Sequence, residues 1–129
     1  LSPVLLKRAR HVVRATERIG QAVKMLRRDD MIGFGSMLTA CHASLRDDYE
    51  VSCPEADALV EAATGHAGCF GSRIVGGGFG GSTVSVVAAD RVDQFRSHVR
   101  QQYHQRTRRD TTVFVCKATD GVGLIWSSD

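Results

Sequence analysis

Residues 71–83 read Gly71-Ser72-Arg73-Ile74-Val75-Gly76-Gly77-Gly78-Phe79-Gly80-Gly81-Ser82-Thr83. Six of these thirteen residues are glycine, and five of the six lie between positions 76 and 81. Glycine is used where the backbone must adopt positive φ or approach another group closely, and consecutive N–H groups in such a turn form a concave nest that binds anions. The run therefore predicts an anion-binding loop, and a phosphate group is the ligand that we expect.

Both flanks of this glycine run have the alternating pattern of β-strands, over residues 69–75 and 83–89. The loop therefore joins two strands, which excludes a dinucleotide site. Although Gly76, Gly78 and Gly81 match the spacing G-x-G-x-x-G, that fingerprint requires a helix directly after the loop. The Gly-Lys-Ser/Thr ending of a P-loop is missing, as are the lysine strand, catalytic loop and metal-binding Asp of protein kinases.

The 129-residue length predicts one domain with its own core, and a 43% hydrophobic composition with two prolines is typical of a soluble globular protein. The sequence contains no apolar run near the roughly 18 residues of a membrane span and no leader pattern. We therefore expect a cytoplasmic protein with no membrane partner. The chain opens with Leu1 and not with methionine, so we expect it to be a piece of something longer.

The charge and cysteine patterns argue against two other classes of function. A net charge of +3, without aromatic residues among the basic clusters, does not favour nucleic-acid binding. The four cysteines are widely spaced and lack a C-x-x-C pair, so we interpret them as buried thiols and assign no metal site. Asp47-Asp48 and His66 are interpreted as surface groups.

Hydrophobic spacing and capping residues predict the remaining elements. Pro3 opens a short helix to about Arg8, and a strand is expected at residues 10–14. Helices follow at residues 15–28, from a cap at Asp29 or Asp30 to Leu45, and from a Ser52/Glu55 capping box to Thr64. After the two central strands we expect a helix capped by Asp90, a turn at 105–110, a strand at 112–117 and a last short strand at 122–126. This order predicts an α+β fold, a ferredoxin-like split βαβ sandwich with extra helices in the first crossover.

The glycine stretch resembles the third signature motif of the GHMP small-molecule kinases, which in galactokinases typically reads G-S-R-M-T-G-G-G-F-G-G-C-T. The present chain differs at Val75 and Ser82, where that family usually has Thr and Cys. Residues 44–55, which read SLRDDYEVSCPE, resemble the galactokinase segment that precedes this motif, and the resemblance reaches back to residues 8–13. It therefore covers nearly the whole chain.

The resemblance implies that residues 1–129 are the GHMP kinase C-terminal domain of a longer two-domain kinase. Such an enzyme transfers the γ-phosphate of ATP, bound with Mg²⁺, to the 1-hydroxyl of galactose. The loop residues implied to support the phosphate site are Gly76, Gly77, Gly78, Phe79, Gly80 and Gly81. Ser72 and Arg73 are further candidates, and Arg73 could either contact phosphate or pair with a carboxylate that shapes the loop.

The family's catalytic Asp, sugar-binding residues and serine-rich ATP loop belong to its N-terminal domain. No catalytic residue is therefore assigned in this chain, which is expected to be inactive alone. A second interpretation stays open at this point: a stand-alone domain that binds a ligand or a partner protein without catalysis. The reading frame upstream of Leu1 would separate the two, because a serine-rich phosphate loop there indicates the kinase.

Overall fold

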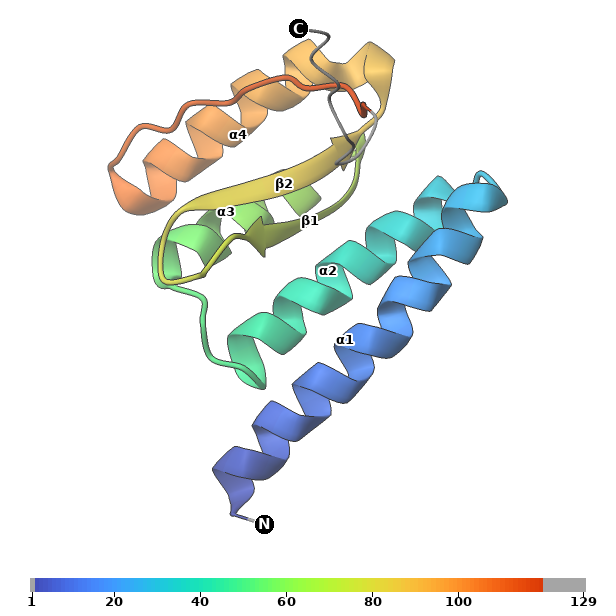
Figure 1. Ribbon diagram of the computed structural model, residues 1–129. Coiled ribbons are helices and arrows are strands. Elements are labelled where there is room, and N and C mark those ends of the chain that lie inside the picture. Colours follow the sequence, from blue (N-terminus) through green and yellow to red (C-terminus); the bar gives the residue numbers. More distant parts are fainter. Residues whose placement is uncertain (1, 120–129) are drawn as a thin grey trace, which may run out of the picture.

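The computed structural model describes residues 2–119, which fold into four helices, a short 3-10 turn and a two-stranded antiparallel sheet. Figure 1 shows the sheet between two helical layers, with α1 and α2 on one side and α3 and α4 on the other. The elements in chain order are α1 (Pro3–Arg27), α2 (Met31–Asp47), α3 (Pro54–Thr64), β1 (Cys69–Val75), β2 (Ser82–Val87), η1 (Ala89–Arg91) and α4 (Val92–Thr107).

Helix α1 runs without a break through the region where the sequence predicts a strand, so the strand at residues 10–14 is wrong. Ser2 caps the helix by accepting a hydrogen bond from the Leu5 N–H at 3.2 Å, and Pro3 occupies the first turn. A β-branched residue costs only about 0.5 kcal/mol in a helix, which a cap and a 25-residue run of hydrogen bonds easily offset. The predicted helices at 3–8 and 15–28 are the two ends of this one element.

Helix α2 lies along the outer edge of β1 and replaces a neighbouring strand there. The Ser72 N–H donates to Thr39 Oγ1 at 3.4 Å, and the Ile74 N–H donates to His42 Nδ1 at 3.2 Å. These side chains satisfy backbone donors that a sheet edge would otherwise leave unpaired. The two backbones come into direct contact where Gly35 faces Gly71, because a Cβ at Gly71 would meet the Gly35 carbonyl oxygen.

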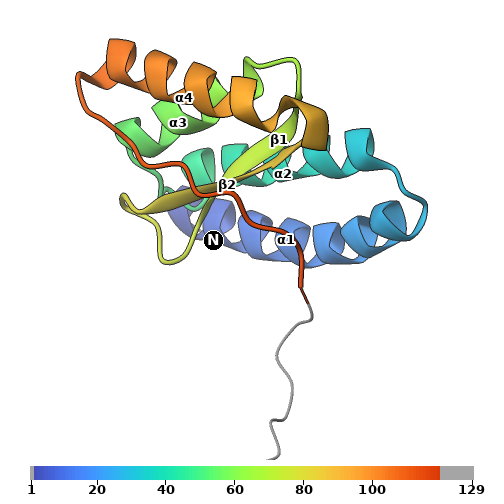
Figure 2. The same cartoon turned by 90° about the horizontal axis from the view of Figure 1, so that it is seen from above.

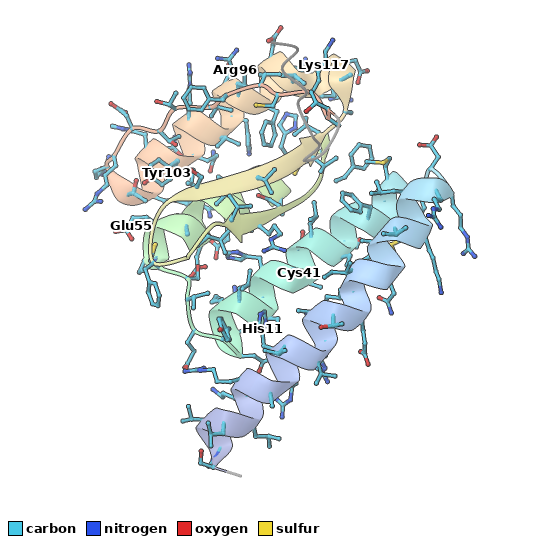
Figure 3. All side chains as sticks on the ribbon, viewed as in Figure 1. His11, Cys41, Glu55, Arg96, Tyr103 and Lys117 are labelled. Carbon is cyan, nitrogen blue, oxygen red and sulfur yellow. The ribbon has the colours of Figure 1, made fainter. Side chains whose placement is uncertain are left out.

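Helices α3 and α4 pack together on one face of the sheet and form the small core. Ala63, Phe95 and Val99 are its centre, with Leu59, Cys69, Val87 and Val113 packed against them. Tyr103 is also buried, on α4, as Figure 3 shows. The predicted inward face of α4 is thus confirmed for Phe95, Val99 and Tyr103, whereas Val92 is only half-buried.

Helix boundaries agree with the sequence better than the caps do. Asp30 caps α2 as predicted, accepting from the Gly33 N–H at 2.9 Å, and α3 begins at Pro54 and ends before Gly65. The Ser52/Glu55 capping box is wrong, because Cys53 occupies the N-cap and no side chain bonds there. Asp90 is not the cap of α4 either, since it lies within η1. Helices α2 and α4 extend to Asp47 and Thr107, into segments predicted as loop and turn.

Residues 108–119 follow α4 without regular secondary structure, so the strand predicted at 112–117 is not formed. The segment passes across α4 in Figure 1 and over the sheet in Figure 2, and Val113 packs on the core. The α+β class is therefore confirmed, but within residues 2–119 only β1 and β2 pair, and the four strands of a ferredoxin-like sheet are not all present. The short strand predicted at 122–126 lies outside the described residues.

Candidate glycine-loop site

Residues 76–81 form the turn between β1 and β2, at the end of the sheet beside the start of α3 (Figure 1). Left-handed backbone occurs at Gly76 with φ 77°, Gly78 with φ 86°, Phe79 with φ 60° and Gly80 with φ 102°. Three of these four positions are glycine, which adopts such angles without strain. The dense glycine run is therefore required by the shape of the turn itself, as the sequence predicts.

The loop rests against the segment between α2 and α3. The Phe79 N–H donates to the Val51 carbonyl at 2.6 Å, and a Cβ on Gly78 would meet that same carbonyl oxygen. Gly80 lies beside Cys53, with 3.8 Å between the place of a Cβ and Sγ. Phe79 donates the one loop N–H hydrogen bond to another segment within residues 2–119, and the other N–H groups of this glycine turn are the candidates for binding an anion.

The supporting segment is fixed in turn by the N-terminal half of α1. Arg8 donates to the Asp48 carbonyl at 2.7 Å and forms an ion pair with Glu50 at 2.7 Å. The hydrogen bond from Arg8 to the Glu50 carboxyl lowers the pKa of that carboxyl. Arg10 approaches Asp48 at 3.6 Å. His11 stacks on Tyr49 with ring centroids 4.7 Å apart, at the place labelled in Figure 3. Burial, followed by the charge of Arg18, lowers the pKa of His11, which favours the neutral ring.

Ser72, one of the two further candidates, lies in the interior and not at the loop surface. Ser72 is 0% exposed. Its hydroxyl donates to the Val84 carbonyl at 3.1 Å and forms a hydrogen bond with Ser85 Oγ at 2.8 Å. With its N–H donated to Thr39, the polar groups of Ser72 hold β1 between β2 and α2. This arrangement leaves the side chain no direct approach to a ligand at the loop.

Arg73, the second candidate, points toward the two long helices. Its Nε donates to the Ile74 carbonyl at 2.9 Å, and its side chain lines a cavity of about 190 Å³ together with His11 and Arg18. No carboxylate within residues 2–119 forms an ion pair with Arg73. The carboxylate partner considered from the sequence is therefore not found in the described part of the chain.

Other polar residues singled out in the sequence have structural partners. Asp47 pairs with its neighbour Arg46 at 2.8 Å, and the hydrogen bond from that guanidinium lowers the pKa of the Asp47 carboxyl. His66 Nδ1 accepts from the Gly68 N–H at 3.0 Å. Asp47 is exposed, as expected of a surface group, whereas His66 is half-buried and its ring packs edge-on against Phe95.

The thiols are less buried than the sequence suggests. All four cysteines are free; Cys41, Cys53 and Cys69 are half-buried and Cys116 is exposed. Burial raises the pKa of the Cys69 thiol, so this thiol is protonated and therefore less reactive at neutral pH. Across residues 2–119, no group of three His, Cys, Asp or Glu side chains is arranged to hold a metal ion. In the same residues, no helix combines the length and apolarity that crossing a bilayer requires.

Sequence reasoning missed Val51, the residue that receives the loop. It also missed the buried His42, which sits on α2 next to β1 and is 2% exposed. Neither residue belongs to a recognisable spacing pattern, because their importance comes from contacts with β1 and the glycine loop, which lie about 30 positions further along the chain. For His42, the one indication in the sequence is that a histidine stands within the apolar stripe of α2.

A tight glycine turn with free N–H groups, on an α+β domain, is the kind of structure that supports a phosphate, and comparison with known proteins identifies the class. The family of GHMP kinases, C terminal, matches residues 22–105, so the chain belongs to the GHMP kinases. The sequence is similar to galactokinases: 49% identical to that of Roseiflexus sp. (strain RS-1) over 94% of this chain, and 45% identical to that of Bos taurus over 97%. The resemblance stated above is thereby confirmed.

Solved structures agree with this assignment. The Lactococcus lactis galactokinase complexed with galactose matches 84% of this chain with a TM-score of 0.81 and 42% identity, and 28% of that chain is covered. The L. major mevalonate kinase in complex with R-mevalonate, at 23% identity, shares the fold with a TM-score of 0.69 over 82% of this chain and 32% of its own. The present chain spans 31% of the length of both galactokinases named above.

Proposed function

We propose that this chain is the C-terminal part of a galactokinase that transfers the γ-phosphate of ATP to the 1-hydroxyl of galactose. The observation that carries the proposal is the 49% identity to a galactokinase over 94% of the chain. The glycine loop adds chemical support, since free N–H groups on a pre-shaped backbone suit a group on which negative charge accumulates. Localisation in the cytoplasm stays a prediction from the sequence.

In this proposal, the chain supplies binding and shape but no reacting group. Magnesium-bound ATP would supply the transferred phosphoryl group, and the N–H groups of Gly77, Gly78, Gly80 and Gly81 would face its phosphates. Residues 2–119 contain no cluster of ligands for the Mg²⁺ ion. Following the resemblance to galactokinases, we assign the main metal ligands, the catalytic base and the sugar contacts to the N-terminal domain of the longer protein.

Two surfaces support the existence of that N-terminal domain. Helix α1 has no fully buried residue along its 25 positions, and Leu5, Val12 and Val13 are each more than half exposed. They line an open groove of about 840 Å³ that ends at Tyr49 and Val51, next to the glycine loop. An apolar face of this kind on a monomeric protein usually has a partner.

The second surface is the outer edge of β2. Because the Ser72 and Ile74 N–H groups face α2, the opposite residues Ser85 and Thr83 direct their N–H groups away from β1. A groove of about 410 Å³ separates this edge from residues 111–116, with Phe95 and Val99 in its lining. A strand of the longer protein placed there would give residues 112–117 a hydrogen-bonding partner, which residues 2–119 do not provide.

The direct test is a galactokinase assay on the longer protein, with mevalonate as the control substrate. ATP-dependent formation of galactose 1-phosphate is the expected result. A protein that binds a ligand or a partner but turns over neither substrate would overturn the proposal and favour the stand-alone binding domain.

The edge of β2 gives a prediction that is independent of activity. In hydrogen exchange, we expect the Thr83 and Ser85 amides to exchange rapidly in the 129-residue chain and to become protected by roughly tenfold or more in the longer protein. The amides of Arg73 and Val75, which face β2, serve as controls because they should be protected in both. Equal exchange at Thr83 and Ser85 in the two proteins would contradict the inserted strand.

A further prediction concerns nucleotide affinity. The 129-residue chain should not bind Mg-ATP tightly, because the glycine loop lacks the main phosphate-binding loop and its helix N-terminus, which the longer protein would supply to complete the nucleotide site. Isothermal titration calorimetry measures this directly. A dissociation constant in the low micromolar range would show that the nucleotide site lies within residues 1–129 and not mainly outside them.

A further inference from the structure

The segment on which the glycine loop rests is held by a network of three side chains, of which His42 is buried and Asp57 and Ser52 are half-buried. His42 on α2 contacts the Asp57 carboxylate on α3, with Nε2 and Oδ1 2.8 Å apart. Ser52 donates its hydroxyl to the same Asp57 oxygen at 2.7 Å. Ser52 is the chain neighbour of Val51, whose carbonyl accepts from the loop, so the network ends one residue away from the loop contact.

The opposite side of the histidine ring fixes its protonation pattern. Nδ1 accepts the Ile74 N–H of β1 at 3.2 Å and therefore carries no proton. Nε2 carries the proton and donates it to Asp57, so the two hydrogen bonds define one tautomer. The carboxylate oxygen receives two donors, and because an acceptor with charge forms stronger hydrogen bonds than a neutral one, the junction resists rotation.

The His42 ring therefore links the two segments that hold the glycine loop, which are β1 and residues 51–53. Through Ile74 it holds β1, from which the loop departs at Val75, and through Asp57 and Ser52 it holds the segment on which Phe79 rests. His42 is 2% exposed, and no atom of it is placed to meet a ligand at the loop. Its geometry fits a role that acts through the backbone.

We propose that His42, Asp57 and Ser52 are positioning residues for the glycine loop, which keep the Phe79 N–H on Val51 and leave the neighbouring N–H groups aimed at a phosphate. This inference rests on the proposed function for its kinetic consequence, but not for its structural one. Loss of the Ser52 hydroxyl should loosen residues 51–53 while the His42–Ile74 bond stays intact. The loop then samples more conformations, and binding of the nucleotide requires that they be ordered again.

The decisive variant is Ser52→Ala, with Ser97→Ala on the exposed face of α4 as the matched control. In hydrogen exchange on the 129-residue chain, Ser52→Ala should raise the exchange rate of the Phe79 amide by roughly three- to tenfold, the loss expected for one hydrogen bond. The Ile74 amide should stay as protected as in the wild type. The ¹⁵N spectrum of His42 should keep the signature of a proton on Nε2.

In the longer protein, Ser52→Ala should raise KM for ATP by a similar factor with little change in KM for galactose, whereas Ser97→Ala should change neither. Asp57→Asn retains an oxygen acceptor and should rescue most of the loop protection that Asp57→Ala loses. Unchanged exchange at Phe79 in both Ser52→Ala and Asp57→Ala would overturn the positioning role. A responsive loop in a longer protein without kinase activity would uphold the positioning and reject the galactokinase proposal, so the two failures are distinguishable.

Discussion

Gly78→Ala should abolish most of the nucleotide-dependent activity of the longer kinase while leaving this domain folded. Gly78 has a φ of 86°, and its added Cβ would meet the Val51 carbonyl oxygen and lie 2.8 Å from Val51 Cβ. The turn cannot keep both its left-handed backbone and its contact with residue 51, so the loop must move. Since loss of one preorganised donor typically costs roughly a hundredfold in rate, displacement of several should reduce kcat/KM for ATP by at least that factor.

The matched control is Gly20→Ala on α1, outside the glycine loop. A Cβ on Gly20 would meet nothing within 4 Å, so this variant should keep nearly full activity. Local strain of roughly 1–3 kcal/mol at Gly78 is small beside the usual 5–15 kcal/mol of a domain, so thermal melting should remain cooperative. Comparable turnover in the two variants would mean that residues 76–81 are only a tight turn.

The glycine loop was predictable because its signal is local. Positive φ, exposed N–H groups and flanking strands all leave a trace within thirteen consecutive residues, and the observed strands 69–75 and 82–87 nearly coincide with the predicted ones. The helix boundaries at Asp30, Pro54 and Gly65 were predictable for the same reason, since each depends on the chemistry of one capping or terminating residue.

The parts that failed depend on contacts between distant segments. The sequence His11-Val12-Val13 favours a strand locally, yet these residues lie inside helix α1, which extends beyond them in both directions. His11 also packs against Tyr49, 38 positions away. Residues 112–117 have the pattern of a strand but no hydrogen-bonding neighbour within the described chain. A strand requires a partner, and a pattern in the sequence cannot supply one.

The support of the loop shows the same limit at the level of the site. Ser52 was assigned to a helix cap by its spacing from Glu55, whereas its hydroxyl instead bonds Asp57. The capping rule describes which local partners a serine can reach, but a carboxylate that is already oriented by His42 is the stronger acceptor. Correct residue types at the correct spacing therefore led to the wrong hydrogen bond.

Gly35→Ala should lower the stability of the domain strongly. The added Cβ would meet the Phe70 carbonyl oxygen and lie 2.6 Å from Phe70 Cβ, so a backbone group of β1 blocks it. Alanine is worth about 1 kcal/mol more than glycine inside a helix, which would by itself stabilise α2. The sign of the effect is therefore decided by whether the helix and the strand can separate.

Separation would be costly because the same interface carries the two hydrogen bonds from β1 to Thr39 and His42. Moving α2 outward strains both, and a buried backbone N–H without an acceptor costs roughly 1–3 kcal/mol. Together with overpacking of about 1–3 kcal/mol, the expected loss in free energy of unfolding is about 3 kcal/mol or more. Urea denaturation of the 129-residue chain, monitored by circular dichroism, should show a clearly lower midpoint.

The control is Gly20→Ala on α1, where a Cβ would meet nothing within 4 Å. This variant should instead raise the free energy of unfolding by roughly 0.5–1 kcal/mol and shift the midpoint slightly upward. Equal gains in the two variants would mean that α2 does not pack on β1 through Gly35, and the support of the glycine loop through His42 would then lose its structural basis.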